Sequence, residues 1–146
     1  MGLSETQRDA LVAGSWAAVL GGAPSTLHAL ATGRDPLAAT KAAGAILLPS
    51  SERALPLVLA AVPVHAGISL GWALVLERAG VRDPVRGAAA GLAIAALDLG
   101  LVRRRFGRVR SLPLAPQLLD HVAYGAIVGL VLGHRRRVSY RGDNGG

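Results

Sequence analysis

Several ionisable side chains of this sequence lie inside long apolar runs, where they are the first candidates for chemistry. They are His28, His65, Asp98, Asp120, His121 and Tyr124. A charged group costs free energy in an apolar environment, so an ionisable residue there is a functional candidate by default. Histidine titrates near neutral pH, and a carboxyl group buried in a membrane can titrate in the same range. The set therefore predicts an intramembrane polar cluster that takes up and releases protons.

Three other roles for the same residues stay open. Each side chain could instead hydrogen-bond a neighbouring helix and hold the structure together. His28, His65 and His121 could bind a metal ion or a haem, although no two histidines are four residues apart and the cofactor is unknown. Asp120 and His121 could belong to a hydrolytic site. The sequence has no nucleophile elbow and no phosphate-binding glycine loop, so an enzyme is the less favoured interpretation.

Four apolar segments must position these side chains, with bounds 10–31, 54–76, 87–102 and 118–133. The first two are long enough, at about 1.5 Å per residue, to cross about 30 Å of hydrocarbon. The last two are shorter and span only if the flanking arginines extend to the headgroups; buried helices of a soluble protein are the alternative. We expect an all-α integral membrane protein, a four-helix transmembrane bundle made of two helical hairpins.

The composition agrees with this expectation. Apolar residues make up 51% of the chain, charged residues 17% and aromatic residues 3%, so a soluble core would lack aromatic volume. The absence of cysteine excludes disulfides, thiolate metal sites and cysteine nucleophiles. The net charge of +7 comes from basic residues that flank the apolar runs. This pattern disfavours nucleic acid and favours anionic lipid headgroups as the partner, with Arg103, Arg104, Arg105, Arg135, Arg136 and Arg137 as the expected contacts.

Small residues and prolines indicate how the helices pack and bend. Glycines spaced four apart predict smooth faces for close helix contact, at Gly67, Gly71, Gly87, Gly91, Gly125 and Gly129. Pro24 and Pro63 precede His28 and His65 by four and two residues, so we expect kinks beside both imidazoles. Broken helices next to polar side chains are how many transporters build ion sites.

The remaining segments complete a single membrane domain, residues 1–137. Residues 36–49 are too short to span and are expected to form an interfacial helix, and residues 138–146 a disordered polar tail. Each side of the membrane would carry eight basic residues, so the positive-inside rule gives a tie. We expect both ends in the cytoplasm and the protein in the cell inner membrane, with insertion in both orientations as an alternative.

The first functional interpretation is therefore a small multi-pass transporter or channel with proton linkage. The alternative is a non-catalytic membrane subunit that holds a partner protein or anionic lipid, either as a homodimer or beside another membrane protein. Haem or metal binding through the intramembrane histidines is a lesser alternative.

Overall fold

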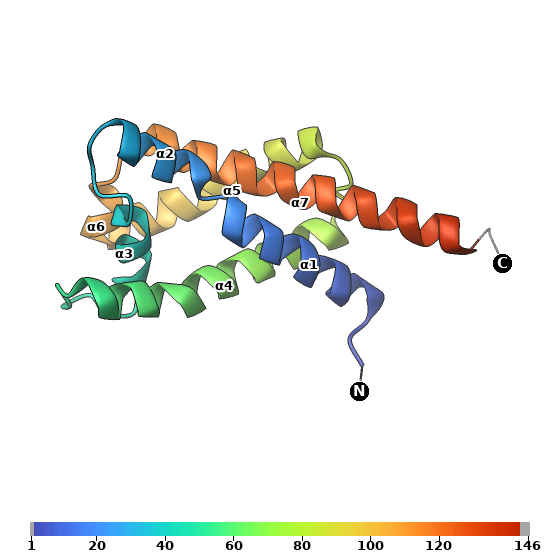
Figure 1. Ribbon diagram of the computed structural model, residues 1–146, viewed down its shortest axis with the longest axis horizontal. Coiled ribbons are helices and arrows are strands. Elements are labelled where there is room, and N and C mark those ends of the chain that lie inside the picture. The colour runs from blue at the N-terminus through green and yellow to red at the C-terminus, as the bar shows by residue number, and fades with distance from the viewer. Residues whose placement is uncertain (1, 144–146) are drawn as a thin grey trace.

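The structure, a computed structural model, describes the backbone of residues 2–143 and the side chains of residues 2–140. This part of the chain is helical without strands. Its helices are α1 (Glu5–Leu20), α2 (Ala23–Ala31), α3 (Ala38–Gly44), α4 (Ala54–Arg78), α5 (Pro84–Arg105), α6 (Gly107–Arg110) and α7 (Leu114–Asp143) (Figure 1). The expected all-α fold is thus confirmed. Four stretches are long and apolar enough to cross a membrane: α1 with α2, α4, α5, and α7 up to Tyr140.

Capping residues set the helix ends, which extend beyond the predicted apolar segments. Ser4 and Gln7 cap the start of α1 with reciprocal hydrogen bonds of 3.2 and 2.9 Å. The Asp83 carboxylate accepts from the backbone N–H of Arg86 at 2.8 Å, so α5 begins at Pro84. With 22 residues, α5 is longer than the segment 87–102 that uncharged residues alone predict.

The last helix also differs from its predicted bounds. It begins at Leu114, directly after a proline, rather than at residue 118. It then continues to Asp143, and so runs through residues 138–143, for which a disordered tail was predicted. Residues 144–146 lie outside the described part of the chain.

The most extensive helix contact joins α5 and α7, where backbone lies against backbone. A Cβ atom added at Gly87 or Gly91 would overlap a carbonyl group of α7, and one added at Gly125 or Gly129 would overlap a carbonyl group at the start of or just before α5. Only glycine permits this approach, so these four residues lie where the sequence pattern expects helix packing.

The predicted glycine face of α4 does not contact another helix in the described residues. No atom lies within 4 Å of a Cβ added at Gly67 or Gly71 of α4, so the packing expected of them is not found in the described residues. Instead α4 packs against α1, where a Cβ added at Gly14 would lie only 2.9 Å from the Cβ of Ala73. Helix α1 thereby lies between α4 and α7.

The segment expected to lie at the interface contains α3, which packs on the start of α4. A Cβ at Gly44 would overlap the carbonyl of Leu57, so the two backbones touch there as well. Arg108 of α6 donates to the carbonyl of Ser51 at 2.8 Å and ties this region to the connection between α5 and α7. Both short helices lie at the left end in Figure 1, whereas the two chain ends and the α4–α5 connection lie at the right.

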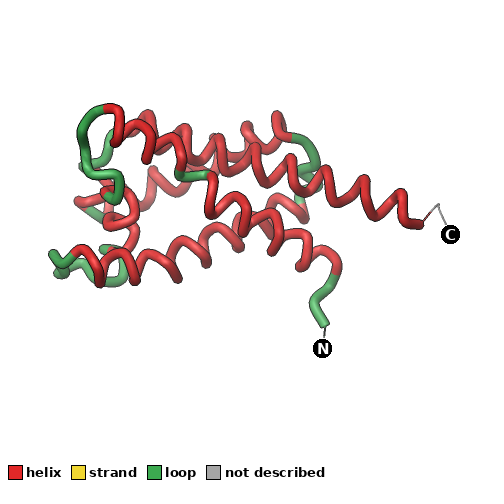
Figure 2. The backbone as a smooth tube through the Cα atoms, in the orientation of Figure 1, coloured by secondary structure: helices red, strands yellow, loops and turns green. Residues whose placement is uncertain are grey.

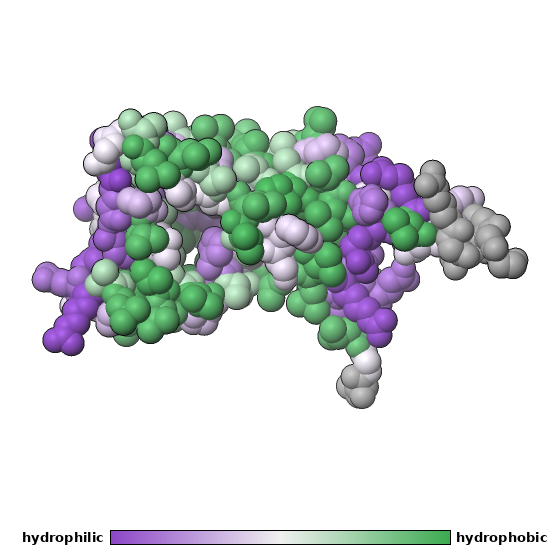
Figure 3. Space-filling model, viewed as in Figure 1, coloured by the Kyte–Doolittle hydropathy of each residue, from purple (hydrophilic) through white to green (hydrophobic). Residues whose placement is uncertain are grey.

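The outer surface is apolar over the middle of the molecule and hydrophilic at both ends (Figure 3). Leu59 and Val62 of α4 are 61% and 62% exposed, Leu101 of α5 is 68% exposed and Leu130 of α7 is 53% exposed. At most 28% of each candidate span is buried inside the protein. Exposing so many large apolar side chains to water is unfavourable, whereas lipid tails are as apolar as they are. The surface therefore has the pattern expected of a protein surrounded by lipid.

Candidate functional site

The first candidate span is broken near its middle, between Leu20 at the end of α1 and Ala23 at the start of α2. Figure 2 shows this short loop in the centre of the molecule, whereas the other loops lie toward its ends. Gly22 precedes the first turn of α2 and Pro24 lies within that turn, where its missing N–H costs nothing. The expected kink at Pro24 is therefore a complete interruption of the helix. By contrast, α4 continues through Pro63.

A broken helix leaves backbone donors without partners at the start of its second half. The N–H of Ser25, in the first turn of α2, donates to the Asp120 carboxylate of α7 at 2.8 Å. A carboxylate at this position also interacts favourably with the positive end of the helix dipole. Asp120 thus caps α2 from another helix, a role usually filled by the residue before the helix.

The same break leaves backbone acceptors at the end of α1. Nε2 of His65, on α4, lies 3.0 Å from the carbonyl oxygen of Ala18. Because a carbonyl oxygen only accepts, Nε2 carries the hydrogen and donates it. His65 is exposed, and Figure 3 shows a hollow with hydrophilic surface between α2 and α4, inside the apolar band. Both sides of the break are therefore completed by ionisable side chains from other helices.

A second polar group joins α4, α5 and α7. The Trp72 indole N–H donates to Oδ2 of Asp98 at 3.1 Å, and Nε2 of His121 lies 3.8 Å from the same oxygen. Nδ1 of His121 lies 2.8 Å from the carbonyl oxygen of Gln117, so Nδ1 carries a hydrogen. The second ring nitrogen therefore faces Asp98.

One turn of α7 connects these groups. Asp120 contacts α2 and the adjacent His121 contacts α5, while the Tyr124 hydroxyl donates to the carbonyl oxygen of Ser69 on α4. Asp120 lies close enough to both His65 and His121 for their charges to act on one another. The polar side chains at positions 65, 98, 120 and 121 thus form one electrostatic network, which we call the polar network.

A small pocket lies beside this network, between α2, the loop that follows α2 and the start of α7. It has a volume of about 40 Å³ and is lined by residues that include His28, Arg34, Asp35, Ser25 and Gln117. Ser25 and Gln117 also hold Asp120 and His121 through their backbone groups. A pocket of this volume has room for at least one water molecule. Its lining includes none of the four side chains of the polar network, but it adjoins them through Ser25 and Gln117.

Asp35, which lines the pocket, belongs to an ion pair formed by the loop before α3. The ammonium group of Lys41 contacts the Asp35 carboxylate, and the backbone N–H of Leu37 donates to it at 2.9 Å. The hydrogen bond from Lys41 is the main reason why the pKa of Asp35 is lowered from its ordinary value, with the Leu37 N–H acting in the same direction.

The structure brings most of the predicted site residues together, but not all of them. His28 lies at the pocket, whereas His65 and His121 hydrogen-bond backbone carbonyls of other residues. In the described residues, no three side chains of the histidine, cysteine, aspartate or glutamate type are placed to hold a metal ion.

The arginines expected at lipid headgroups divide into three groups. Arg103 folds back and donates to the carbonyls of Val109, Arg110 and Leu112, so it closes the connection after α5. Arg135 pairs with Asp9 of α1 at 2.5 Å. The other four are exposed: Arg104 and Arg105 at one end, Arg136 and Arg137 at the other.

Sequence reasoning missed several residues that build the site. Trp72 is the donor to Asp98, and Gly21 makes room for Tyr124, since a Cβ there would lie 3.2 Å from the tyrosine Cβ. The signal available for Trp72 was its polar N–H within an apolar run, which needs a partner when it is buried. Comparisons with protein-family models, curated proteins and solved structures found no match, so the interpretation of this site rests on its geometry.

Proposed function

We propose that the chain is a multi-pass protein of the cell inner membrane, built from two helical hairpins, and that its polar network carries protons as part of a transport or channel cycle. The exposed leucine and valine side chains of the four candidate spans support insertion. The contacts of α1 with α4 and of α5 with α7 support the hairpin arrangement.

The observation that carries the functional proposal is the interruption of the first span, with Asp120 and His65 on its two sides. The hydrogen bond from Ser25 is strengthened by the negative charge of Asp120. Protonation of Asp120 removes that charge and weakens the hold on α2. A proton arriving at Asp120 therefore changes how firmly α2 is attached to α7, which couples protonation to a movable half-helix.

The Asp98–His121 pair gives the proton a second site one residue away on α7. His121 accepts through Nε2 while Nδ1 stays bound to Gln117, so the ring does not need to turn when a proton moves between Asp98 and His121. The small pocket beside Ser25 gives water access from the side that carries Arg34 and Asp35. Protons would enter there and reach Asp120 and His121 first.

Proton flux into liposomes tests this proposal. Purified protein is reconstituted into vesicles that contain a pH-sensitive dye, and a potassium diffusion potential drives protons inward. We expect Asp98→Asn and His121→Gln to abolish protein-dependent flux, because both keep hydrogen bonding but lose titration. Glu52→Gln, in an exposed loop, is the matched control and should match the wild type. Flux unchanged in both test variants, or wild-type flux no faster than in protein-free vesicles, would refute the proton role.

Single cysteines test the membrane orientation, since the chain has none of its own. With both ends in the cytoplasm, Ser139→Cys should be protected from a membrane-impermeant maleimide in intact spheroplasts. Ser50→Cys, in the loop before α4, should react. The reverse pattern would place both ends outside, and partial labelling of both would indicate insertion in two orientations.

A further inference from the structure

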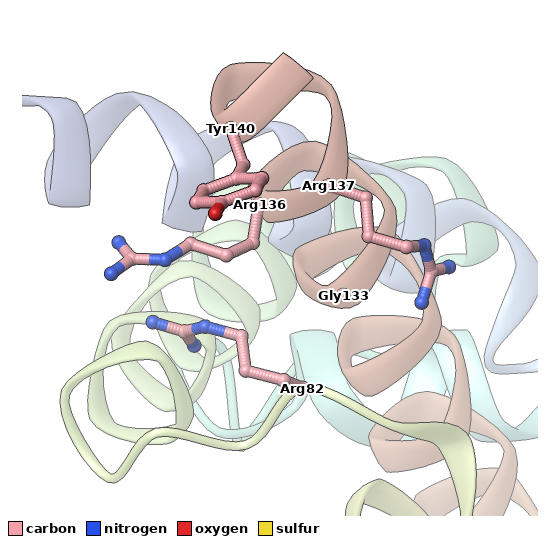
Figure 4. A pocket seen from close by; sticks show the side chains of 5 residues that line it. All are labelled: Arg82, Gly133, Arg136, Arg137 and Tyr140. Atoms are coloured by element: carbon pink, nitrogen blue, oxygen red, sulfur yellow. The ribbon is translucent and has the colours of Figure 1, made fainter. Parts of the chain in front are cut away.

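A second concave site lies at the opposite end of the molecule from the α3 loops, where α7 passes the connection between α4 and α5. The pocket has a volume of about 410 Å³ and is lined by Arg82, Gly133, Arg136, Arg137 and Tyr140 (Figure 4). Gly133 sets its shape, because a Cβ there would overlap the carbonyl of Arg82. The close approach places the Arg82 side chain beneath the next turn of α7.

Arg82, in the connection between α4 and α5, is held in place by three hydrogen bonds within the protein. The Arg82 guanidinium donates to the Glu77 carboxylate at 2.7 Å and to the backbone carbonyls of Glu77 and Val81 at 3.2 and 3.1 Å. Its position therefore does not depend on a ligand. A fixed guanidinium is a preorganised donor, and less entropy is lost when an anion binds to it.

Two arginines of α7, Arg136 and Arg137, supply positive charge that no described side chain neutralises. Arg135 is paired with Asp9, but Arg136 and Arg137 form no ion pair with a described side chain, and no carboxylate lines the pocket. Figure 4 shows the Arg82 and Arg136 side chains extending to the same side of α7 beneath the Tyr140 ring, while Arg137 extends to the other side. Arg82 is already paired with Glu77, so Arg136 supplies the positive charge of this space that no described carboxylate neutralises.

In the membrane insertion proposed above, the pocket would lie at the level of the lipid headgroups. Its residue Gly133 directly follows the buried Leu132 of α7, and its residue Arg82 follows the buried Leu76 of α4. Arginine and tyrosine side chains are enriched at this level of membrane proteins.

We propose that this pocket binds a phosphate group, with the guanidinium groups of Arg82 and Arg136 as its two principal donors. Guanidinium presents paired N–H donors that match the oxygens of a phosphate, which makes arginine the preferred residue for such groups. The phosphate belongs either to the headgroup of an anionic lipid or to a free phosphate from solution. This site is independent of the polar network.

Binding of a short-chain anionic lipid tests the site. The full-length protein, held in nanodiscs of phosphatidylcholine, is titrated with dihexanoyl phosphatidylglycerol and, separately, with inorganic phosphate. The test variant is Arg136→Gln. Its matched control is Arg53→Gln, which removes the same charge from an exposed position before α4. Arg136→Lys keeps the charge but loses the paired donors.

We expect Arg136→Gln to weaken binding about fivefold, the value for one basic residue near an anionic headgroup, and the control to change it less than twofold. The loss of binding in Arg136→Lys should lie between the losses in these two variants. Binding of the lipid alone identifies a headgroup site, and binding of inorganic phosphate as well identifies a general phosphate site. No binding by the wild type, or an equal loss in Arg136→Gln and Arg53→Gln, would overturn the proposal.

Discussion

The contact between Asp120 and the start of α2 can be measured by replacing the aspartate with alanine. Hydrogen bonds to charged groups contribute about 1.5–3 kcal/mol, and at 2.8 Å the bond from Ser25 has good geometry. Asp120→Ala removes the acceptor and leaves the Ser25 N–H unpaired, so we expect the free energy of unfolding to fall by about 2 kcal/mol. Asp120→Asn keeps an oxygen acceptor but loses the charge, and should cost about 1 kcal/mol.

Two measurements separate this capping role from a general loss of stability. Unfolding by sodium dodecyl sulfate in mixed micelles gives the free-energy difference. Hydrogen exchange gives the local effect, because 2 kcal/mol corresponds to about 30-fold faster exchange of the Ser25 amide. Glu52→Ala, in an exposed loop, is the control, because it removes one negative charge without removing a contact to α2. The reasoning fails if Ser25 exchanges at the wild-type rate in Asp120→Ala, whatever the global stability.

Two further predictions concern packing and the loop ion pair. Gly125→Ala should lower the free energy of unfolding by about 1–3 kcal/mol, since the new Cβ overlaps the facing backbone of α5. Gly100→Ala meets nothing within 4 Å and should be neutral or slightly stabilising, so equal melting temperatures would contradict the backbone contact. Lys41→Met should raise the pKa of Asp35 toward its ordinary value, measured by NMR titration of the carboxyl carbon. Because the Asp35 pKa is lowered in the folded state, the pair stabilises the protein above the ordinary aspartate range, and this contribution is lost as the pH falls through the lowered pKa. An Asp35 pKa that is the same in Lys41→Met would show that Lys41 is not the cause.

The four long apolar segments could be predicted from the sequence because hydropathy depends only on local composition. Their ends could not, because capping and flanking arginines decide where a helix stops. The third segment was predicted to end before Arg103, yet α5 includes that residue and its neighbours up to Arg105. A helix tolerates arginines at its end, where they interact favourably with the carbonyl groups of the last turn.

Residue spacing predicted which glycines share a face but not which face meets another helix. Gly87 and Gly125 touch backbone, whereas Gly67 and Gly71 have the same spacing and touch nothing. The polar side chains inside the spans were identifiable one by one. Their pairing was not, because the bond between Trp72 and Asp98 depends on how α4 crosses α5, which no local pattern encodes.

The break in the first span has a consequence for the order in which the protein can be completed. Ser25 and its acceptor Asp120 are separated by 95 residues, so α2 emerges from the ribosome long before its cap exists. At about 5–20 residues per second, the interval is about 5–20 s. During that time the nine residues of α2 are too few to cross a bilayer alone and have an unpaired amide at their start. The start of α2 therefore gains its cap only after α7 has been synthesised, so an early helix of the chain depends on the last one.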